Sequence, residues 1–147
     1  MQLQTYLFFD GRCDEAVEFY QAAIGAKVDV LLRFKDGPPP GDGGCSPGMA
    51  PGSENKVMHG VLRIGDATVL VSDGLCGGAP NFAGFSLAVT AATNEEAEQQ
   101  FAALAEGGRI DQPLAETFFT SRFGMLTDKF GVHWMVTVVQ AASQTAA

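Results

Sequence analysis

An internal repeat constrains the fold of this chain more than any other feature of its sequence. Two stretches with the same pattern are separated by 81 or 82 residues, which is more than half of the chain. The matched residues are Glu15 and Glu96, Ala16 and Ala97, Tyr20 and Phe101, and Gly25 and Gly107. A period of this length predicts two copies of one structural unit. Two such units can each bury one sheet face under a helix and together enclose a curved cleft.

The first copy is expected to contain one helix and four strands. Its apolar and aromatic first segment predicts a strand that is buried on both faces. Apolar residues at helical spacing then form one buried stripe, which Gly25 terminates. The turn Gly65-Asp66 predicts a hairpin. The expected elements are a strand at 3–9, a helix at 14–24, and strands at 28–34, 57–64 and 67–72.

The second copy repeats this order. Thr93 and Glu96 have the spacing of a capping box, so a helix should begin there, and Gly107-Gly108 should end it. The expected strands are at 85–89, 109–117, 123–127 and 132–139. The sequence therefore predicts an α+β protein, a single domain over 1–147 made of two βαβββ units at about 1–73 and 83–140. Their strands should form a curved mixed sheet around a cleft.

A segment rich in glycine and proline interrupts the first unit. Residues 36–52 contain five prolines and six glycines in 17 positions, which predicts a long mobile loop. The segment lacks the Gly-Lys-Ser/Thr ending of a phosphate-binding loop, so a surface excursion or lid is the favoured interpretation.

Composition and charge limit the possible partners. Of the 147 residues 46% are hydrophobic, which indicates a folded chain, and no apolar run is long enough to span a membrane. The net charge of −8 opposes binding to nucleic acid. The amino terminus shows no secretory signal, and the three cysteines form no Cys-x-x-Cys pair. We therefore expect a soluble cytoplasmic protein with free thiols.

Several short motifs resemble one known family. The chain is similar to PhnB-like proteins of the vicinal-oxygen-chelate superfamily, which includes glyoxalases and bleomycin-resistance proteins. The closing run is the most characteristic, although Lys129 stands where proline is usual. The motifs that carry the resemblance are Tyr6-Leu7-Phe8-Phe9-Asp10-Gly11, Glu15-Ala16-Val17-Glu18-Phe19-Tyr20, Met58-His59-Gly60, Val71-Ser72-Asp73, Arg122-Phe123-Gly124 and Asp128-Lys129-Phe130-Gly131-Val132-His133-Trp134.

The resemblance also implies where a metal would bind in this superfamily. The corresponding positions fall on Thr5, Leu70, Phe85 and Met135, or on Ser72 in place of Leu70 after a shift in register. None of these side chains supplies the imidazole or carboxylate that a divalent ion needs, so no metal and no cofactor are expected. Some members carry a demethylubiquinone methyltransferase label, but the sequence has no glycine-rich dinucleotide-type loop between a strand and a helix.

The resemblance implies that the four metal positions face the cleft and that Arg122 borders it, and strand alternation then predicts which neighbouring side chains share that face. His133 flanks Met135 on one strand, and a two-residue turn at Gly65-Asp66 places His59 and Arg63 on the same face as Ser72. Both histidines would then share one surface. The candidate ligand-binding residues are Thr5, His59, Arg63, Ser72, Phe85, Arg122, His133 and Met135. No Asp or Glu reaches this face by the same count, so a neutral or anionic ligand is expected.

Two functions remain open. The first is a metal-free protein that binds a small molecule in its cleft. The second is a metal-independent enzyme that uses His59 or His133 as a general acid or base on a small oxygenated substrate. The resemblance further implies a homodimer, and no catalytic residue is assigned.

Overall fold

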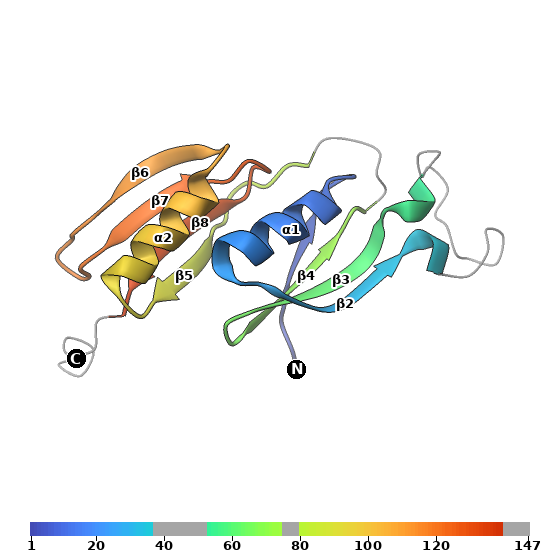
Figure 1. The fold of residues 1–147 in the computed structure, drawn as a ribbon, viewed down its shortest axis with the longest axis horizontal. Helices are drawn as coiled ribbons and strands as arrows, with labels where there is room; N and C mark the ends of the chain where they lie inside the picture. The colour runs from blue at the N-terminus through green and yellow to red at the C-terminus, as the bar shows by residue number, and fades with distance from the viewer. Residues whose placement is uncertain (37–52, 75–79, 140–147) are drawn as a thin grey trace. The chain divides into compact units, whose positions relative to one another are not determined.

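The computed structural model describes residues 1–36, 53–74 and 80–139. The chain divides into two compact units, Met1–Pro80 and Asn81–Ala147. Each unit has the element order strand, helix and three strands (Figure 1). The predicted α+β fold with two βαβββ units is therefore confirmed. The predicted loop at 36–52 lies outside the described residues except for Asp36.

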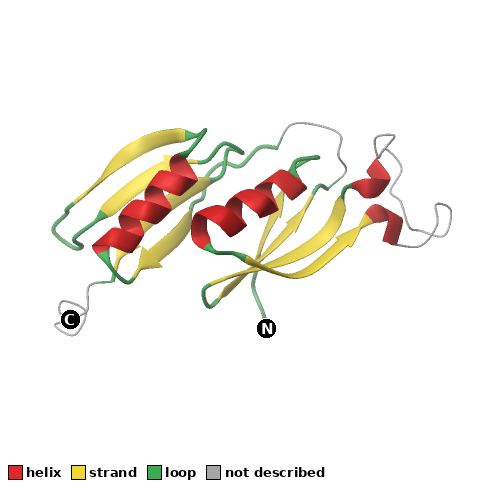
Figure 2. Ribbon diagram, viewed as in Figure 1, coloured by secondary structure: helices red, strands yellow, loops and turns green. Residues whose placement is uncertain are grey.

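The first unit is a four-stranded mixed sheet with one helix across a face (Figure 2). The strand order is β1-β4-β3-β2, in which β1 and β4 are parallel and the other pairs are antiparallel. Two short 3-10 turns, η1 and η2, flank the undescribed segment. The elements are β1 (Thr5–Phe8), α1 (Cys13–Ile24), β2 (Lys27–Arg33), η1 (Phe34–Asp36), η2 (Ser53–Asn55), β3 (Val57–Ile64) and β4 (Ala67–Ser72).

The second unit has the same topology. Its strand order is β5-β8-β7-β6, again with one parallel pair, β5 and β8. The elements are β5 (Leu87–Ala91), α2 (Asn94–Ala105), β6 (Arg109–Ala115), β7 (Phe123–Thr127) and β8 (His133–Val138). Repetition of both the element order and the strand order explains why the two halves share a sequence pattern.

Local contacts fix the start of α2 and the end of α1. At α2 the hydroxyl of Thr93 accepts a hydrogen bond from the backbone N–H of Glu96 at 3.1 Å, and the Glu96 carboxylate accepts one from Ala92. The predicted helix start with Thr93 as its cap is confirmed, but the Glu96 carboxylate binds the N–H of Ala92 and not that of Thr93 as in a regular capping box. Helix α1 ends at Gly25, whose φ of 68° is the left-handed conformation that glycine adopts without a steric penalty.

Each sheet buries the face that its helix covers. In the second unit Trp134 and Val136 are buried on this side, beside Leu126 of the neighbouring strand. Trp134 is thus a core residue, on the opposite face of β8 from His133. The first strand differs from its prediction, because Tyr6 and Phe8 are 38% and 50% exposed. Only one face of β1 is covered.

The described helices give no sign of a membrane span. None of them is both long enough and apolar enough to cross a bilayer.

Candidate functional site

We call the side of each sheet that faces away from its helix the open face. Directly paired residues on neighbouring strands share a face. Thr5 pairs with Val69, which is buried on the helix side, whereas Tyr6 pairs with Leu70. The placement predicted for Thr5 is therefore wrong by one residue, and Tyr6 occupies the open face instead. The cause is the register of the parallel β1–β4 pair, which strand composition alone does not fix.

The open face of the first unit carries an aromatic pair beside a histidine. The rings of Tyr6 and Phe8 are stacked, with centroids 4.8 Å apart and planes 4° apart. The hydroxyl of Tyr6 lies 2.7 Å from Nδ1 of His59. Partial burial raises the pKa of the Tyr6 hydroxyl above its ordinary value, so the hydroxyl stays protonated at neutral pH. Sequence reasoning missed this pairing, although alternation along β1 would have indicated it.

The hairpin that positions His59 has the predicted turn. Val61 pairs with Leu70, and Arg63 pairs with Thr68, as a two-residue turn requires. Ser72 behaves differently from the other candidates because it is 3% exposed. Its hydroxyl accepts a hydrogen bond from Gly74 N–H at 2.9 Å and lies 3.4 Å from the carbonyl oxygen of Val57. These contacts give Ser72 a structural role, because they join the end of β4 to the start of β3.

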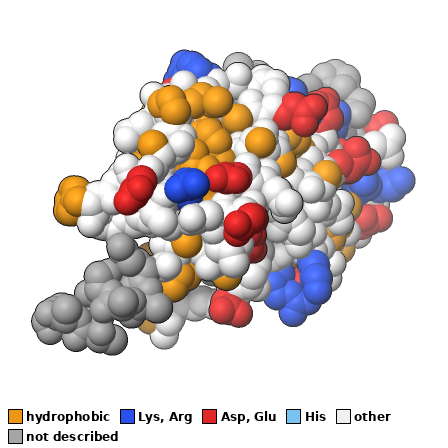
Figure 3. Space-filling model, turned by 60° about the vertical axis from the view of Figure 1, so that its left-hand side comes forward, with side chains coloured by type: hydrophobic (Ala, Val, Ile, Leu, Met, Phe, Trp, Pro, Cys, Tyr) orange, Lys and Arg blue, Asp and Glu red, His pale blue; other side chains and the backbone are white. Residues whose placement is uncertain are grey.

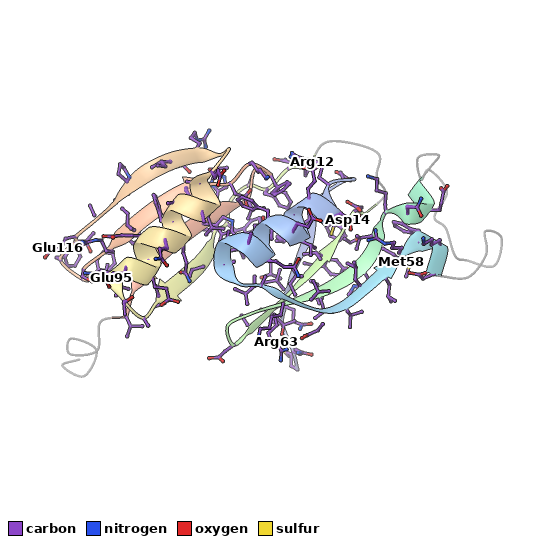
Figure 4. All side chains as sticks on the ribbon, in the orientation of Figure 1. Arg12, Asp14, Met58, Arg63, Glu95 and Glu116 are labelled. Carbon is purple, nitrogen blue, oxygen red and sulfur yellow. The ribbon has the colours of Figure 1, made fainter. Side chains whose placement is uncertain are left out.

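Both candidate arginines have carboxylate partners. Arg63, labelled in Figure 4, contacts Asp29 at 3.1 Å. Arg122 contacts Glu98 at 3.1 Å and also donates to the backbone oxygen of Ser121 at 2.7 Å. On the surface shown in Figure 3, acidic and basic side chains lie among apolar ones, without a large basic area. The expectation that no Asp or Glu reaches the face of these residues does not hold at Arg63, because the Asp29 carboxylate contacts its guanidinium group.

In the second unit the remaining candidates lie around one hollow. Phe85, His133 and Met135 line it together with Gly84 and Ser86, and its volume is about 460 Å³. Phe85 precedes β5 and is 40% exposed, whereas His133 and Met135 are half-buried on the open face of β8. The hollow thus joins two apolar side chains and one titratable side chain, and all of them belong to one unit.

A polar network that ends at Nδ1 of His133 crosses β6, β7 and β8. The hydroxyl of Thr127 donates to Oδ2 of Asp111 at 2.7 Å and lies 3.1 Å from Nδ1 of His133. Arg109 donates through Nε to Oδ1 of Asp111 at 2.7 Å. The pKa of Asp111 is lowered, chiefly because its carboxylate accepts the hydrogen bond from Thr127 and secondly because it accepts the one from Arg109. Sequence reasoning missed Thr127 and Asp111, because placing them required the length of the β7–β8 turn and the irregular register of β6.

The structure places the two histidines in different units. His59 lies on β3 of the first unit and His133 on β8 of the second. The expectation that both share one cleft surface stays a prediction.

The donor groups do not fit the divalent metal site of the superfamily. Of the four positions implied by the resemblance, Leu70, Phe85 and Met135 carry no imidazole or carboxylate, and Thr5 lies on the helix side of its sheet. Across residues 1–36, 53–74 and 80–139, no three His, Cys, Asp or Glu side chains gather closely enough to hold an ion. The side chains at these four positions are therefore unsuited to hold a divalent ion.

Comparison with known proteins agrees with the fold and the motifs. Residues 1–137 match the family described as 3-demethylubiquinone-9 3-methyltransferase. The chain belongs to this family. Protein YjdN of Escherichia coli K12 is 34% identical over 143 residues, covering 95% of this chain and 97% of YjdN.

Similarity to two solved structures agrees with this family and places the chain among the PhnB-like proteins of the vicinal-oxygen-chelate superfamily. Protein PA1353 of Pseudomonas aeruginosa is 36% identical with a TM-score of 0.79, covering 95% of this chain and 98% of that one. A putative 3-demethylubiquinone-9 3-methyltransferase, PhnB protein, of Bacillus cereus is 27% identical with a TM-score of 0.74, covering 95% and 100%.

The described strand-to-helix connections differ from the glycine-rich turn of a dinucleotide-type cofactor fold. A dinucleotide-type cofactor fold places a glycine-rich turn between a strand and the helix that follows. Here the β1–α1 connection is Phe9-Asp10-Gly11-Arg12, and the β5–α2 connection is Ala92-Thr93. Neither connection contains the repeated glycines that bring a backbone close to a phosphate group.

Proposed function

We propose that this protein binds a small organic molecule in the hollow of the second unit, without a metal ion. The observation that carries the proposal is the grouping of Phe85, Met135 and His133 around a shallow hollow that is wide open to solvent, with a volume of about 460 Å³. Small-molecule sites combine mostly apolar walls with a few polar groups that orient the ligand. Here the walls are Phe85 and Met135, and the orienting group is the imidazole of His133.

The charges favour a neutral ligand over an anionic one. Of the four basic or titratable residues that favour an anion, Arg63, Arg122, His59 and His133, both arginines are paired with a carboxylate. Asp111 also lies 3.8 Å from Nδ1 of His133. Asp111 is itself paired with Arg109, so these two groups provide no net positive charge to attract an anion, and a neutral molecule needs none.

A second candidate function is metal-independent general acid or base catalysis. It is favoured by the hydroxyl groups that hold both imidazoles, Tyr6 at His59 and Thr127 at His133. A fixed imidazole can accept or donate a proton at its second ring nitrogen. Turnover of a ligand found for the hollow would support this function, and binding without turnover would favour the first.

A ligand titration tests where binding occurs and which charge is preferred. The probes are benzyl alcohol as a neutral molecule, methylphosphonate as an anion and a bleomycin-like polycation, each followed by amide chemical shifts and thermal stability. We expect saturable shifts near Phe85 and Met135 with benzyl alcohol, and their loss in Phe85→Ala. The matched control Phe8→Ala removes an exposed aromatic ring from the first unit. Shifts that persist in Phe85→Ala, or stabilisation by the polycation alone, would contradict the proposal.

The metal-free part of the proposal has its own test. Elemental analysis of the purified protein should find no stoichiometric Zn, Ni, Mn or Fe, and chelators should leave its melting temperature unchanged. One metal ion per chain, lost from the His133→Gln variant, would contradict this expectation.

A further inference from the structure

The network behind His133 fixes which ring nitrogen carries the proton. An ionised carboxylate only accepts hydrogen bonds, so the Thr127 hydroxyl must give its single hydrogen to Asp111, 2.7 Å away. The Thr127 oxygen then has only lone pairs to offer His133, whose Nδ1 lies 3.1 Å away. Nδ1 must therefore donate, and in the neutral imidazole Nε2 keeps a lone pair.

The carboxylate that sets this direction is itself held in place. Arg109 donates to Oδ1 of Asp111 at 2.7 Å through Nε, and its NH2 group lies 3.3 Å from the Thr127 hydroxyl oxygen. Arg109 also keeps Asp111 ionised, because a neighbouring positive charge favours the charged form. Among the described residues, Asp111 and Arg109 are the charged groups that contact Thr127. Both lie on the same side of the His133 ring as Nδ1.

Nε2 is the ring nitrogen of His133 that this network leaves available, and His133 lines the hollow. No hydrogen bond to Nε2 occurs within the part of the chain that the structure describes, and His133 lines the hollow with Phe85 and Met135. A lone pair on Nε2, with two apolar side chains in the same hollow, favours a ligand of one chemical kind. It accepts a hydrogen from an O–H or N–H group whose neighbouring atoms are apolar.

We propose that the hollow recognises neutral molecules that join an apolar body to a hydroxyl or N–H donor, with that donor on Nε2 of His133. Phe85 and Met135 hold the apolar body. Thr127 and Asp111 are positioning residues, because they act on the ligand only through His133. This inference rests on the proposed function and adds to it the chemical class of ligand.

The first test measures the imidazole and needs no ligand. NMR of the ring nitrogens at about pH 8, where an ordinary histidine is neutral, shows which nitrogen bears hydrogen. The chain contains two histidines, so a His59→Gln variant assigns the signals. We expect hydrogen on Nδ1 of His133 in the native chain and a mixture of both forms in Thr127→Val. Hydrogen on Nε2 in the native chain, or no change in Thr127→Val, would overturn the proposal.

A matched control separates the network from a general effect of losing a threonine. Thr137 lies on the same strand face as His133, and its hydroxyl contacts only Thr90, at 3.4 Å, among the hydrogen bonds of the described residues. Thr137→Val should leave the His133 signals as they are in the native chain. Thermal melting of both variants shows whether each is folded. If Thr137→Val altered the imidazole as strongly as Thr127→Val does, the assignment of Thr127 would be wrong.

The second test uses two probes that differ in one hydrogen-bond donor. Phenol and anisole have the same ring, but only phenol has an O–H group. We expect phenol to bind roughly fivefold more tightly than anisole, as one net hydrogen bond provides. The ratio should fall to about one in His133→Phe, decrease in Thr127→Val and persist in Thr137→Val. Equal binding of both probes by the native chain would overturn this inference and leave the hollow as a binding site. Binding of neither probe would overturn the proposed function as well.

Discussion

The carboxylate of Asp128 accepts a hydrogen bond from the indole Nε1–H of Trp134 at 2.9 Å, and both side chains are buried. The other carboxylate oxygen accepts from the backbone N–H groups of Phe130 and Val132 at 2.9 and 3.1 Å. Gly131 completes the turn with a φ of 95°. The family motif Asp-x-Phe-Gly-x-x-Trp is thus a turn whose first and last residues are joined by one carboxylate.

The variant Asp128→Asn should lower the free energy of unfolding by about 3 kcal/mol, because an amide group would turn a donor toward buried donors. Chemical denaturation measures the change. The control is Asp66→Asn in the exposed β3–β4 turn, which should change stability by less than about 0.5 kcal/mol. An Asp128→Asn variant as stable as this control would show that the turn does not depend on the carboxylate.

A second buried carboxylate, that of Asp73, caps the start of helix α1. Asp73 accepts hydrogen bonds from the backbone N–H groups of Gly11, Cys13 and Val57 at 2.7, 2.8 and 2.8 Å. It therefore joins the start of α1 to the start of β3. Arg12, at the N-cap position, makes no side-chain capping bond.

Asp73→Ala should destabilise the protein by about 4 kcal/mol, because three backbone donors lose their acceptor. The Thr93→Ala variant of α2 removes an exposed cap and should cost only about 1 kcal/mol. Amide hydrogen exchange at Cys13 and Val57 should accelerate in Asp73→Ala and stay near native in Thr93→Ala. Unchanged exchange at these two amides would contradict this role for Asp73.

The sequence predicts the elements well because the local signals agree with one another. Hydrophobic periodicity, the Thr93 cap and the Gly65-Asp66 turn each depend on neighbouring residues, and the β3–β4 hairpin bounds match the prediction. The internal repeat adds the element order of the second unit. Strand ends are less certain, as β5 shows, since it begins at Leu87 and leaves Phe85 outside.

The candidate site is harder to predict because it depends on contacts between distant segments. The face of Thr5 depends on the register of a parallel pair that joins strands more than 60 residues apart. Asp111 approaches His133 through a register shift in β6, which alternation along a regular strand does not reveal. Buried carboxylates such as Asp73 look in the sequence like ordinary surface charges.

The oligomeric state implied by the resemblance is a further prediction. We expect a homodimer, because several large apolar side chains, including Tyr6, Phe8 and Leu32, are exposed on the first unit. Sedimentation equilibrium at micromolar concentration should give twice the chain mass of 15.5 kDa. A single species of chain mass over this concentration range would remove the prediction.

Acid sensitivity should come in part from the ion pair that ties β2 to α1. The two terminal guanidinium nitrogens of Arg33, Nη1 and Nη2, each donate to the Asp14 carboxylate at 2.9 Å. Nη1 also donates to the backbone oxygen of Asn55 at 2.7 Å. The hydrogen bonds from Arg33 lower the pKa of Asp14 below its ordinary value of 3.8. A carboxyl group whose pKa is lower in the folded state stabilises the fold fully above its unfolded pKa, and that contribution is lost as the pH falls through the folded value.

Asp14→Asn should therefore lower stability at pH 7 and have little effect well below pH 3.8, where the native carboxyl group is also protonated. Asp14 is half exposed, so solvent screening limits the difference at pH 7 to about 0.5 kcal/mol. Urea denaturation of both proteins at several pH values measures it. Glu18→Gln, an exposed change on the same helix, is the control. A constant difference between Asp14→Asn and the native chain at all pH values would show that the loss does not arise from the Arg33 pair.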